Sequence, residues 1–129
     1  FRRVLFRSTT STKESRTKLS PTVSLGDAVW NISRSSLLVA ALATGDVAAL
    51  HDATQDRLHQ DVRLAMVPET KRAIRAAMDS GAWAAWLSGS GPTMACMVDP
   101  LRVDQVVAAL PRSGQVHRLQ IDASGPSVS

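Results

Sequence analysis

Two short apolar runs on either side of a glycine-rich loop constrain the fold of this chain more than any other feature. The runs at residues 82–87 and 93–98 flank the sequence Ser-Gly-Ser-Gly-Pro. Short apolar runs bounded by glycine and proline are typical of buried strands. We therefore expect two strands joined by a loop. Trp83 and Trp86 should point to opposite faces, so that both faces are covered.

The residues before this point follow a helical period instead. We expect a helix over residues 27–44 that ends at Gly45 and whose second half, apolar all round, is central and packed on several sides. Asp46 can cap a second helix, which the apolar spacing continues to Val62. A third helix should begin at Pro68 and end at Gly81.

The second helix carries a polar face on which Asp56, Gln60 and Arg63 fall together. A guanidinium is a good two-pronged partner for a carboxylate or phosphate, and the aspartate could orient it or accept a hydrogen bond from a ligand amine. The alternative is a solvated face with a surface pair worth under about 1 kcal/mol. Composition alone favours the solvated face.

The C-terminal part completes the predicted architecture. Residues 101–110 have apolar positions at helical spacing, residues 115–122 are typical of a final strand, and residues 124–129 should be a loose tail. Helices followed by strand, strand, helix and strand indicate an α+β domain. We expect the helices on one face of a mainly antiparallel, ferredoxin-like sheet.

The first eight residues, Phe-Arg-Arg-Val-Leu-Phe-Arg-Ser, stand apart from the rest. They are compatible with a basic edge strand, but they also resemble the conceptual translation of a sequencing adapter. We adopt the second interpretation, set residues 1–8 aside and place the domain at residues 9–123. Without the three arginines of this segment the formal charge falls from +4 to +1, which removes the case for a nucleic-acid partner. An adapter also implies that the chain is the C-terminal part of a longer protein.

The remaining composition indicates a cytoplasmic protein. No apolar run approaches the roughly 20 residues of a membrane span, and no secretory signal opens the chain. The single cysteine, Cys96, lies in an apolar run and suits an inert buried thiol in a reducing compartment. The three histidines do not have the spacing of metal ligands, so we expect no metal site.

The loop itself is a candidate site. Its residues Ser88, Gly89, Ser90 and Gly91 include two glycines that can adopt positive φ, so that successive N–H groups converge on an anion. Hairpin loops use the same residues for purely conformational reasons. On its own the loop therefore leaves a phosphate contact and a plain turn as alternatives.

Taken together, four segments resemble the C-terminal portion of the homoserine kinases, a family within the GHMP small-molecule kinase superfamily. They are Ser-Thr-Lys-Glu-Ser-Arg at 11–16, the helix at 27–42, Asp-Arg-Leu-His-Gln at 56–60 with Arg63, and the loop at 87–93. The first of these has the Ser-x-x-Glu spacing of a capping box and should start a short helix. The resemblance covers about residues 9–122.

This resemblance implies a kinase that transfers the γ-phosphoryl group of ATP to L-homoserine, giving O-phospho-L-homoserine for threonine synthesis. Arg16 and Arg63 would grip the substrate carboxylate, and the Gly89–Gly91 loop would help to close the site over the phosphates. The family's phosphate-binding loop is absent from these residues, so ATP and Mg²⁺ would be bound mainly by the other half. The chain alone is therefore expected to be inactive.

Two alternatives remain. One is another GHMP kinase, such as a diphosphocytidyl-methylerythritol kinase, which carries a similar loop. The other is a non-catalytic α+β module that binds an amino acid. None of these interpretations calls for a nucleic acid or a membrane as partner, and all leave a homodimer open.

Overall fold

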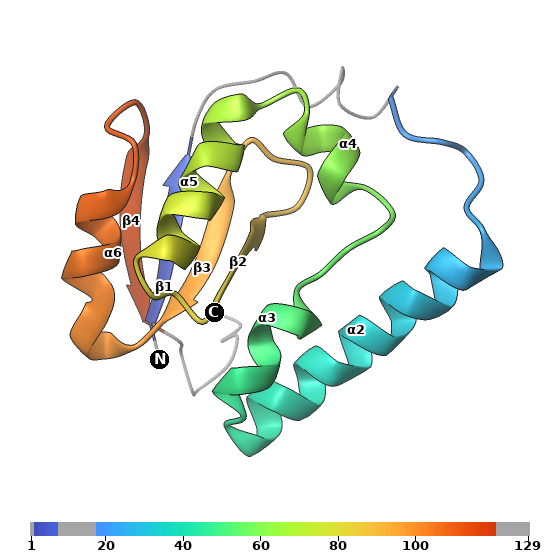
Figure 1. Ribbon diagram of the computed structural model, residues 1–129, viewed down its shortest axis with the longest axis horizontal. Helices are drawn as coiled ribbons and strands as arrows, with labels where there is room; N and C mark the ends of the chain where they lie inside the picture. The colour runs from blue at the N-terminus through green and yellow to red at the C-terminus, as the bar shows by residue number, and fades with distance from the viewer. Residues whose placement is uncertain (1, 8–17, 121–129) are drawn as a thin grey trace, which may run out of the picture.

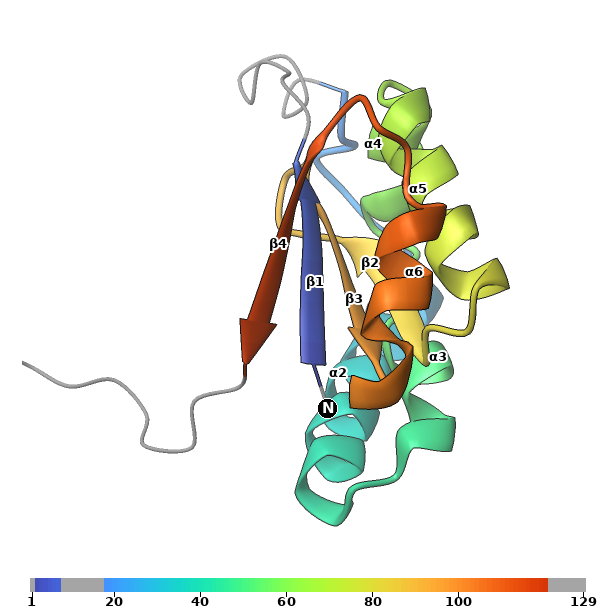
Figure 2. The same cartoon turned by 90° about the vertical axis from the view of Figure 1, so that its left-hand side faces the viewer.

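The structure is a computed structural model that describes residues 2–7 and 18–120. One four-stranded sheet has the order β2-β3-β1-β4, and every neighbouring pair is antiparallel (Figures 1 and 2). Its strands are β1 (Arg2–Arg7), β2 (Ala84–Leu87), β3 (Met94–Val98) and β4 (Gln115–Gln120). The helices are α2 (Leu25–Thr44), η1 (Val47–Ala49), α3 (Leu50–Ala53), α4 (Gln60–Leu64), α5 (Pro68–Asp79), η2 (Pro100–Arg102) and α6 (Val103–Ala109). The expected α+β fold with a ferredoxin-like sheet is confirmed.

Helices α5 and α6 cover one face of this sheet, as Figure 2 shows. Apolar residues alternate along the strands and point toward these helices. The main core is formed by Val4, Phe6, Ala73, Ala77, Ala82, Met94, Cys96, Val98, Val106 and Leu110. Burial also raises the pKa of the Cys96 thiol to about 11, because the thiolate would lose its hydration. The expectation of a buried, unreactive thiol is therefore confirmed.

The segment that the sequence analysis set aside forms β1, an interior strand between β3 and β4. Val4 lies opposite Cys96 on one side and Arg118 on the other, and both Val4 and Phe6 are fully buried. The sequence was compatible with an edge strand here. The segment is a strand, but it lies inside the sheet, so the expected edge position was wrong. Residues 2–7 thus pack inside the domain, while their origin in an adapter stays an interpretation of the sequence.

Helix α2 begins close to the expected residue but does not lie in the core. The Ser24 hydroxyl accepts a hydrogen bond from the Asp27 N–H at the start, and Gly45 ends the helix with a φ of 72°. Only Ala41 is buried in this helix, whereas Leu25 is 82% and Val39 70% exposed. The expectation of a central helix packed on several sides was therefore wrong. No helix in the described part of the chain is long and apolar enough to cross a membrane.

The inner side of α2 and the short helices after it form a second, smaller core against the other face of β2 and β3. Ala41 and Leu50 pack there with Ala84 and Met97. Trp83 and Trp86 both pack against this cluster, so the expected opposite placement of the tryptophans was wrong. Trp83 precedes the first residue of β2, and the strand alternation does not reach it.

The second predicted helix is broken in the structure. Asp46 caps as expected, since its carboxylate accepts hydrogen bonds from the N–H groups of Ala48 and Ala49. The helical turns then stop at Ala53, and α4 starts only at Gln60. Asp56 lies in the connection and not on a helix face, because its carboxylate binds the backbone instead of allowing the helix to continue.

The Asp56 carboxylate caps the start of α4. Its Oδ1 accepts hydrogen bonds from the N–H groups of Leu58, His59 and Gln60, at 2.9, 2.6 and 2.8 Å. Burial opposes the charged form, but these hydrogen bonds and one from the Asn31 side chain outweigh it, so the pKa of Asp56 lies below its ordinary value of 3.8. Ionised Asp56 therefore stabilises this part of the fold.

The interior position of β1 can be tested by truncating single side chains on its two faces. Val4→Ala should lower the free energy of unfolding by about 2 kcal/mol, because it leaves a cavity in the main core. Leu5→Ala is the matched control, since Leu5 lies on the opposite, partly exposed face. Urea unfolding followed by circular dichroism measures both. A larger loss for Leu5→Ala than for Val4→Ala would contradict the register.

The Asp56 cap has a pH signature. Asp56→Asn should lower the free energy of unfolding by about 1–2 kcal/mol at pH 7, as expected for a weakened cap. The pKa of Asp56 is depressed in the folded state, so its contribution is complete above pH 3.8 and is lost as the pH falls through the folded value. Urea unfolding at pH 7 and pH 3 should show the difference between wild type and variant shrinking at pH 3. A difference that is equal at both values would contradict the cap, and the exposed Asp79→Asn serves as control.

Candidate functional site

Arg63 and the glycine loop, which the sequence suggested separately, come together in the structure. The Arg63 Nη1 atom donates a hydrogen bond to the Gly89 carbonyl oxygen at 3.3 Å and lies 3.4 Å from Nδ1 of His59. The Arg63 Nε atom is shielded from solvent and has no hydrogen-bond partner among the described residues. A shielded donor without a partner costs about 1–3 kcal/mol, which a bound anion would offset.

Gln60 fixes this arrangement by joining α4 to the end of β2. Its Oε1 accepts a hydrogen bond from the Leu87 N–H at 2.7 Å, and its Nε2 donates to the Thr54 carbonyl oxygen at 3.0 Å. Both polar ends of the side chain are thus used for structure. Gln60 therefore sets the distance between α4 and the loop that follows Leu87.

The loop has the left-handed backbone that its glycines predict. Gly89 and Gly91 have φ values of 62° and 75°, and a Cβ atom at Gly91 would lie 2.9 Å from Cδ1 of Leu87. The Ser88 N–H donates to the Thr93 carbonyl at 2.8 Å, which closes the loop at its base. The N–H groups of Gly89 and Ser90 make no hydrogen bond within the described residues. The Gly91 N–H donates to the Ser88 carbonyl oxygen at 3.2 Å, so that of the four candidate residues Ser88, Gly89, Ser90 and Gly91 only Gly89 and Ser90 have N–H groups without a partner among the described residues.

The predicted common helix face of Asp56 and Arg63 is wrong. Asp56 is occupied by the backbone of α4, and Arg63 contacts His59 and Gly89 instead. The reason is the break before α4, which removes the common helix face. The other predicted clamp residue, Arg16, lies outside the described residues, as does the capping box at residues 11–14.

The sequence analysis gave no role to the side chains of α2 that hold the Asp56 segment. The Asn31 amide donates to Oδ2 of Asp56 at 2.7 Å, and its oxygen accepts from the Arg57 N–H at 3.0 Å. The Trp30 ring stacks between two guanidinium groups, with Cζ of Arg34 at 4.0 Å and Cζ of Arg57 at 3.6 Å from its centre. The contacts of Asn31 and Trp30 with residues 56 and 57 span 25 to 27 residues of chain and have no local signal, whereas Trp30 and Arg34 are four apart on one helix.

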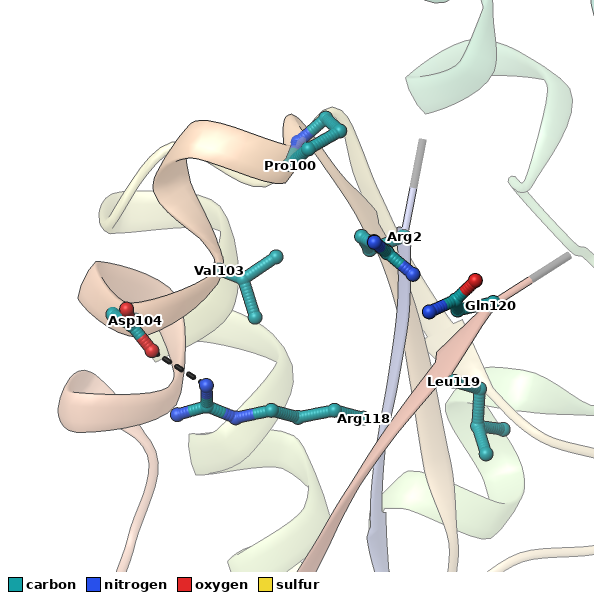
Figure 3. A pocket seen from close by; sticks show the side chains of 7 residues that line it. All are labelled: Arg2, Pro100, Val103, Asp104, Arg118, Leu119 and Gln120. Atoms are coloured by element: carbon teal, nitrogen blue, oxygen red, sulfur yellow. Dashed lines mark ion pairs between the residues drawn. The ribbon is translucent and has the colours of Figure 1, made fainter.

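A cavity of about 330 Å³ lies at the far end of the sheet, between β1, β4 and α6 (Figure 3). Figure 3 shows the Arg118 side chain reaching across to Asp104, with which it forms an ion pair at 2.6 Å. The ion pair leaves Arg2 as the one charged lining residue of this cavity without an ion-pair partner among the described residues. No group of three or more His, Cys, Asp or Glu side chains able to hold a metal ion occurs in residues 2–7 and 18–120.

Comparison with known proteins shows that this chain is similar to kinases. The family model described as "GHMP kinases C terminal" matches residues 38–116. A homoserine kinase of Desulfitobacterium hafniense is 40% identical over 125 residues, which cover 92% of this chain and 42% of that protein. A homoserine kinase of Moorella thermoacetica is 48% identical over 86 residues, 67% of this chain and 29% of that protein. The chain thus spans about two-fifths or less of the length of these relatives.

A solved structure supports the same fold. The crystal structure of a homoserine kinase from Cytophaga hutchinsonii superimposes with a TM-score of 0.83 at 22% identity. The match covers 93% of this chain and 41% of that one. At this identity the likeness concerns the fold alone, whereas the family model covers more than half of the chain. The chain therefore belongs to the GHMP kinases, as their C-terminal domain.

Proposed function

We propose that this chain is the C-terminal part of a homoserine kinase, which transfers the γ-phosphoryl group of ATP to the hydroxyl group of L-homoserine. The observation that carries the proposal is the position of Arg63 beside the glycine loop. The 40% identity to a homoserine kinase over nearly the whole chain supports the choice of substrate. We place the protein in the cytoplasm, where the free thiol of Cys96 stays reduced.

In this proposal Arg63 binds the α-carboxylate of homoserine. Its Nη1 atom is held by Gly89 and His59, and Nε lacks a partner, so the guanidinium is oriented before the ligand arrives. A guanidinium offers a carboxylate two parallel donors, which fixes its orientation. Arg16 is proposed as the second carboxylate ligand on the strength of the family resemblance. Holding the substrate in place is a large part of catalysis in phosphoryl transfer.

The glycine loop is proposed to contact the phosphates of ATP. The N–H groups of Gly89 and Ser90, which have no partner among the described residues, fit an anion, and they lie next to the proposed carboxylate site. The described residues offer no carboxylate cluster for Mg²⁺, so we assign the metal and most of the nucleotide to the remaining part of the kinase. Bound Mg²⁺ supplies charge neutralisation at the phosphates.

The proposal is tested by restoring the missing part. Residues 9–129 would be joined to the N-terminal part of the Desulfitobacterium hafniense homoserine kinase, and phosphorylation of homoserine would be followed by coupled ADP release. The chimera should turn over, and the 129-residue chain alone should not. A folded chimera that binds ATP but prefers diphosphocytidyl-methylerythritol would overturn the choice of substrate. Turnover by the chain alone would contradict the division of roles.

The role of Arg63 is tested in the same chimera. Arg63→Lys keeps the charge but loses the fork, so the KM for homoserine should rise about tenfold or more, equivalent to about 1.4 kcal/mol. The KM for ATP should change less than about twofold. Arg75→Lys, at an exposed position of α5, is the matched control. An unchanged KM for homoserine in Arg63→Lys would count against the carboxylate contact.

A further inference from the structure

His59 lies between the carboxylate that caps α4 and the arginine beside the glycine loop. Its Nδ1 atom is 3.4 Å from Nη1 of Arg63, and its Nε2 atom is 3.4 Å from Oδ2 of Asp56. The side chain of His59 is 32% exposed and that of Asp56 only 10%. Both residues also line a cavity of about 250 Å³ that is bounded by Arg34 of α2. One ring therefore connects the cap to the proposed carboxylate ligand.

Only one neutral form of this imidazole fits both of its neighbours. A neutral imidazole carries its proton on one ring nitrogen and accepts a hydrogen bond at the other. Arg63 offers only donors, so Nδ1 has to accept and the proton has to lie on Nε2. There the N–H faces Asp56, which is ionised at neutral pH. The opposite form would place an N–H against the guanidinium and a lone pair against the carboxylate.

The Asp56 carboxylate is itself held in place, so it can orient the ring. Its Oδ1 accepts hydrogen bonds from three backbone N–H groups, and its Oδ2 accepts one from Asn31 at 2.7 Å. The backbone of His59 belongs to the same cap, because its N–H is one of these three donors, at 2.6 Å. A change of the His59 side chain therefore leaves the donors of the cap in place.

The way in which Arg63 uses its donors decides where a ligand can bind to it. Nη1 carries two hydrogens, and its two acceptors are Nδ1 of His59 and the Gly89 carbonyl oxygen at 3.3 Å. Nε and Nη2 make no hydrogen bond in the part of the chain that the structure describes. These two atoms carry parallel N–H groups on one edge of the guanidinium. Such a pair of donors binds both oxygens of a carboxylate.

We propose that His59 is a positioning residue, whose neutral ring accepts a hydrogen bond from Nη1 of Arg63 and thereby leaves the Nε–Nη2 edge of the guanidinium for the substrate carboxylate. This inference rests on the proposed function, which assigns the carboxylate to Arg63. His59 itself does not touch the substrate. A guanidinium that is already oriented loses less conformational entropy when the ligand binds. Removal of the ring should therefore weaken the binding of homoserine and leave that of ATP largely unchanged.

Kinetics of the chimera with the Desulfitobacterium hafniense N-terminal part test this role. His59→Ala should raise the KM for homoserine about three- to tenfold, as expected for the loss of one hydrogen bond to a charged group. Both kcat and the KM for ATP should change less than about twofold. His59→Asn keeps an acceptor close to the position of Nδ1, so its KM for homoserine should lie within about twofold of wild type. His117→Ala, at an exposed position of β4, is the matched control.

A double-mutant cycle shows whether His59 acts through Arg63. When added to Arg63→Lys, His59→Ala should raise the KM for homoserine by less than about twofold more, since lysine has no Nε–Nη2 edge for the ring to orient. If the two effects multiply, or if only Arg63→Lys raises this KM, the inference fails and the proposed function stands. If Arg63→Lys leaves the KM unchanged, the proposed carboxylate contact fails, and this inference fails with it.

A measurement on the unaltered chain covers the case in which His59→Ala does not fold. Long-range nitrogen–proton correlation spectra show which ring nitrogen of a neutral histidine carries the proton. At pH 8, His59 in the 129-residue chain should be in the Nε2–H form alone, whereas the exposed His117 should exchange between both forms. An Nδ1–H form at His59, or a mixture of both forms there, would overturn the proposal.

Discussion

The region between α3 and β2 depends on one buried carboxylate. The first N–H groups of a helix have no partners within the helix, and Asp56 supplies an acceptor for the N–H of Gln60, the first residue of α4, and for those of Leu58 and His59 just before it. A continuous helix would satisfy the same N–H groups internally, but it would leave Asp56 without these donors. The charge-assisted cap turns the chain at this point. The turn allows Gln60 to reach Leu87 and Arg63 to reach Gly89.

The segment between α3 and α4 lies between two different regions of the structure. On one side Arg63 lies beside the loop that follows β2, and on the other side Asp56 faces the cavity lined by Arg34. Asn31 connects the segment to α2 through two hydrogen bonds. The geometry of both regions is therefore set by a few polar contacts rather than by the main core. A change in these polar contacts would therefore alter the geometry of both regions.

The sequence predicted the elements whose signal is local. Helix α5, the β2–β3 hairpin and α6 follow from hydrophobic periodicity and from Pro68, Gly81 and the Ser88–Pro92 loop, since each element is defined by residues a few positions apart. The break before α4 was missed because the apolar spacing continues at the helical period across Asp56, although the hydrogen bonds of Asp56 that end the helix are local. The exposure of α2 was missed for another reason. Hydropathy shows that Ile32 and Val39 are apolar, but not whether another element covers them.

The arrangement of Arg63 beside the glycine loop was predicted in part. The residue types and the positive φ of the two loop glycines follow from the sequence, because guanidinium chemistry and glycine geometry are intrinsic to each residue. The contact between Arg63 and Gly89 does not, since it joins residues 26 positions apart. The stacking of Arg57 on Trp30 likewise has no local signal, whereas Arg34 is four residues from Trp30 on the same helix.

The interior position of β1 also governs how the sheet can assemble. The β2–β3 hairpin can form from neighbouring residues, whereas Arg2 pairs with Val98 on one side and with Gln120 on the other. Closing such long loops is entropically costly, and pairings of this kind slow folding. Until β1 is in place, β4 has no strand beside it. The sheet is therefore held together across its middle by contacts between the two ends of the described chain.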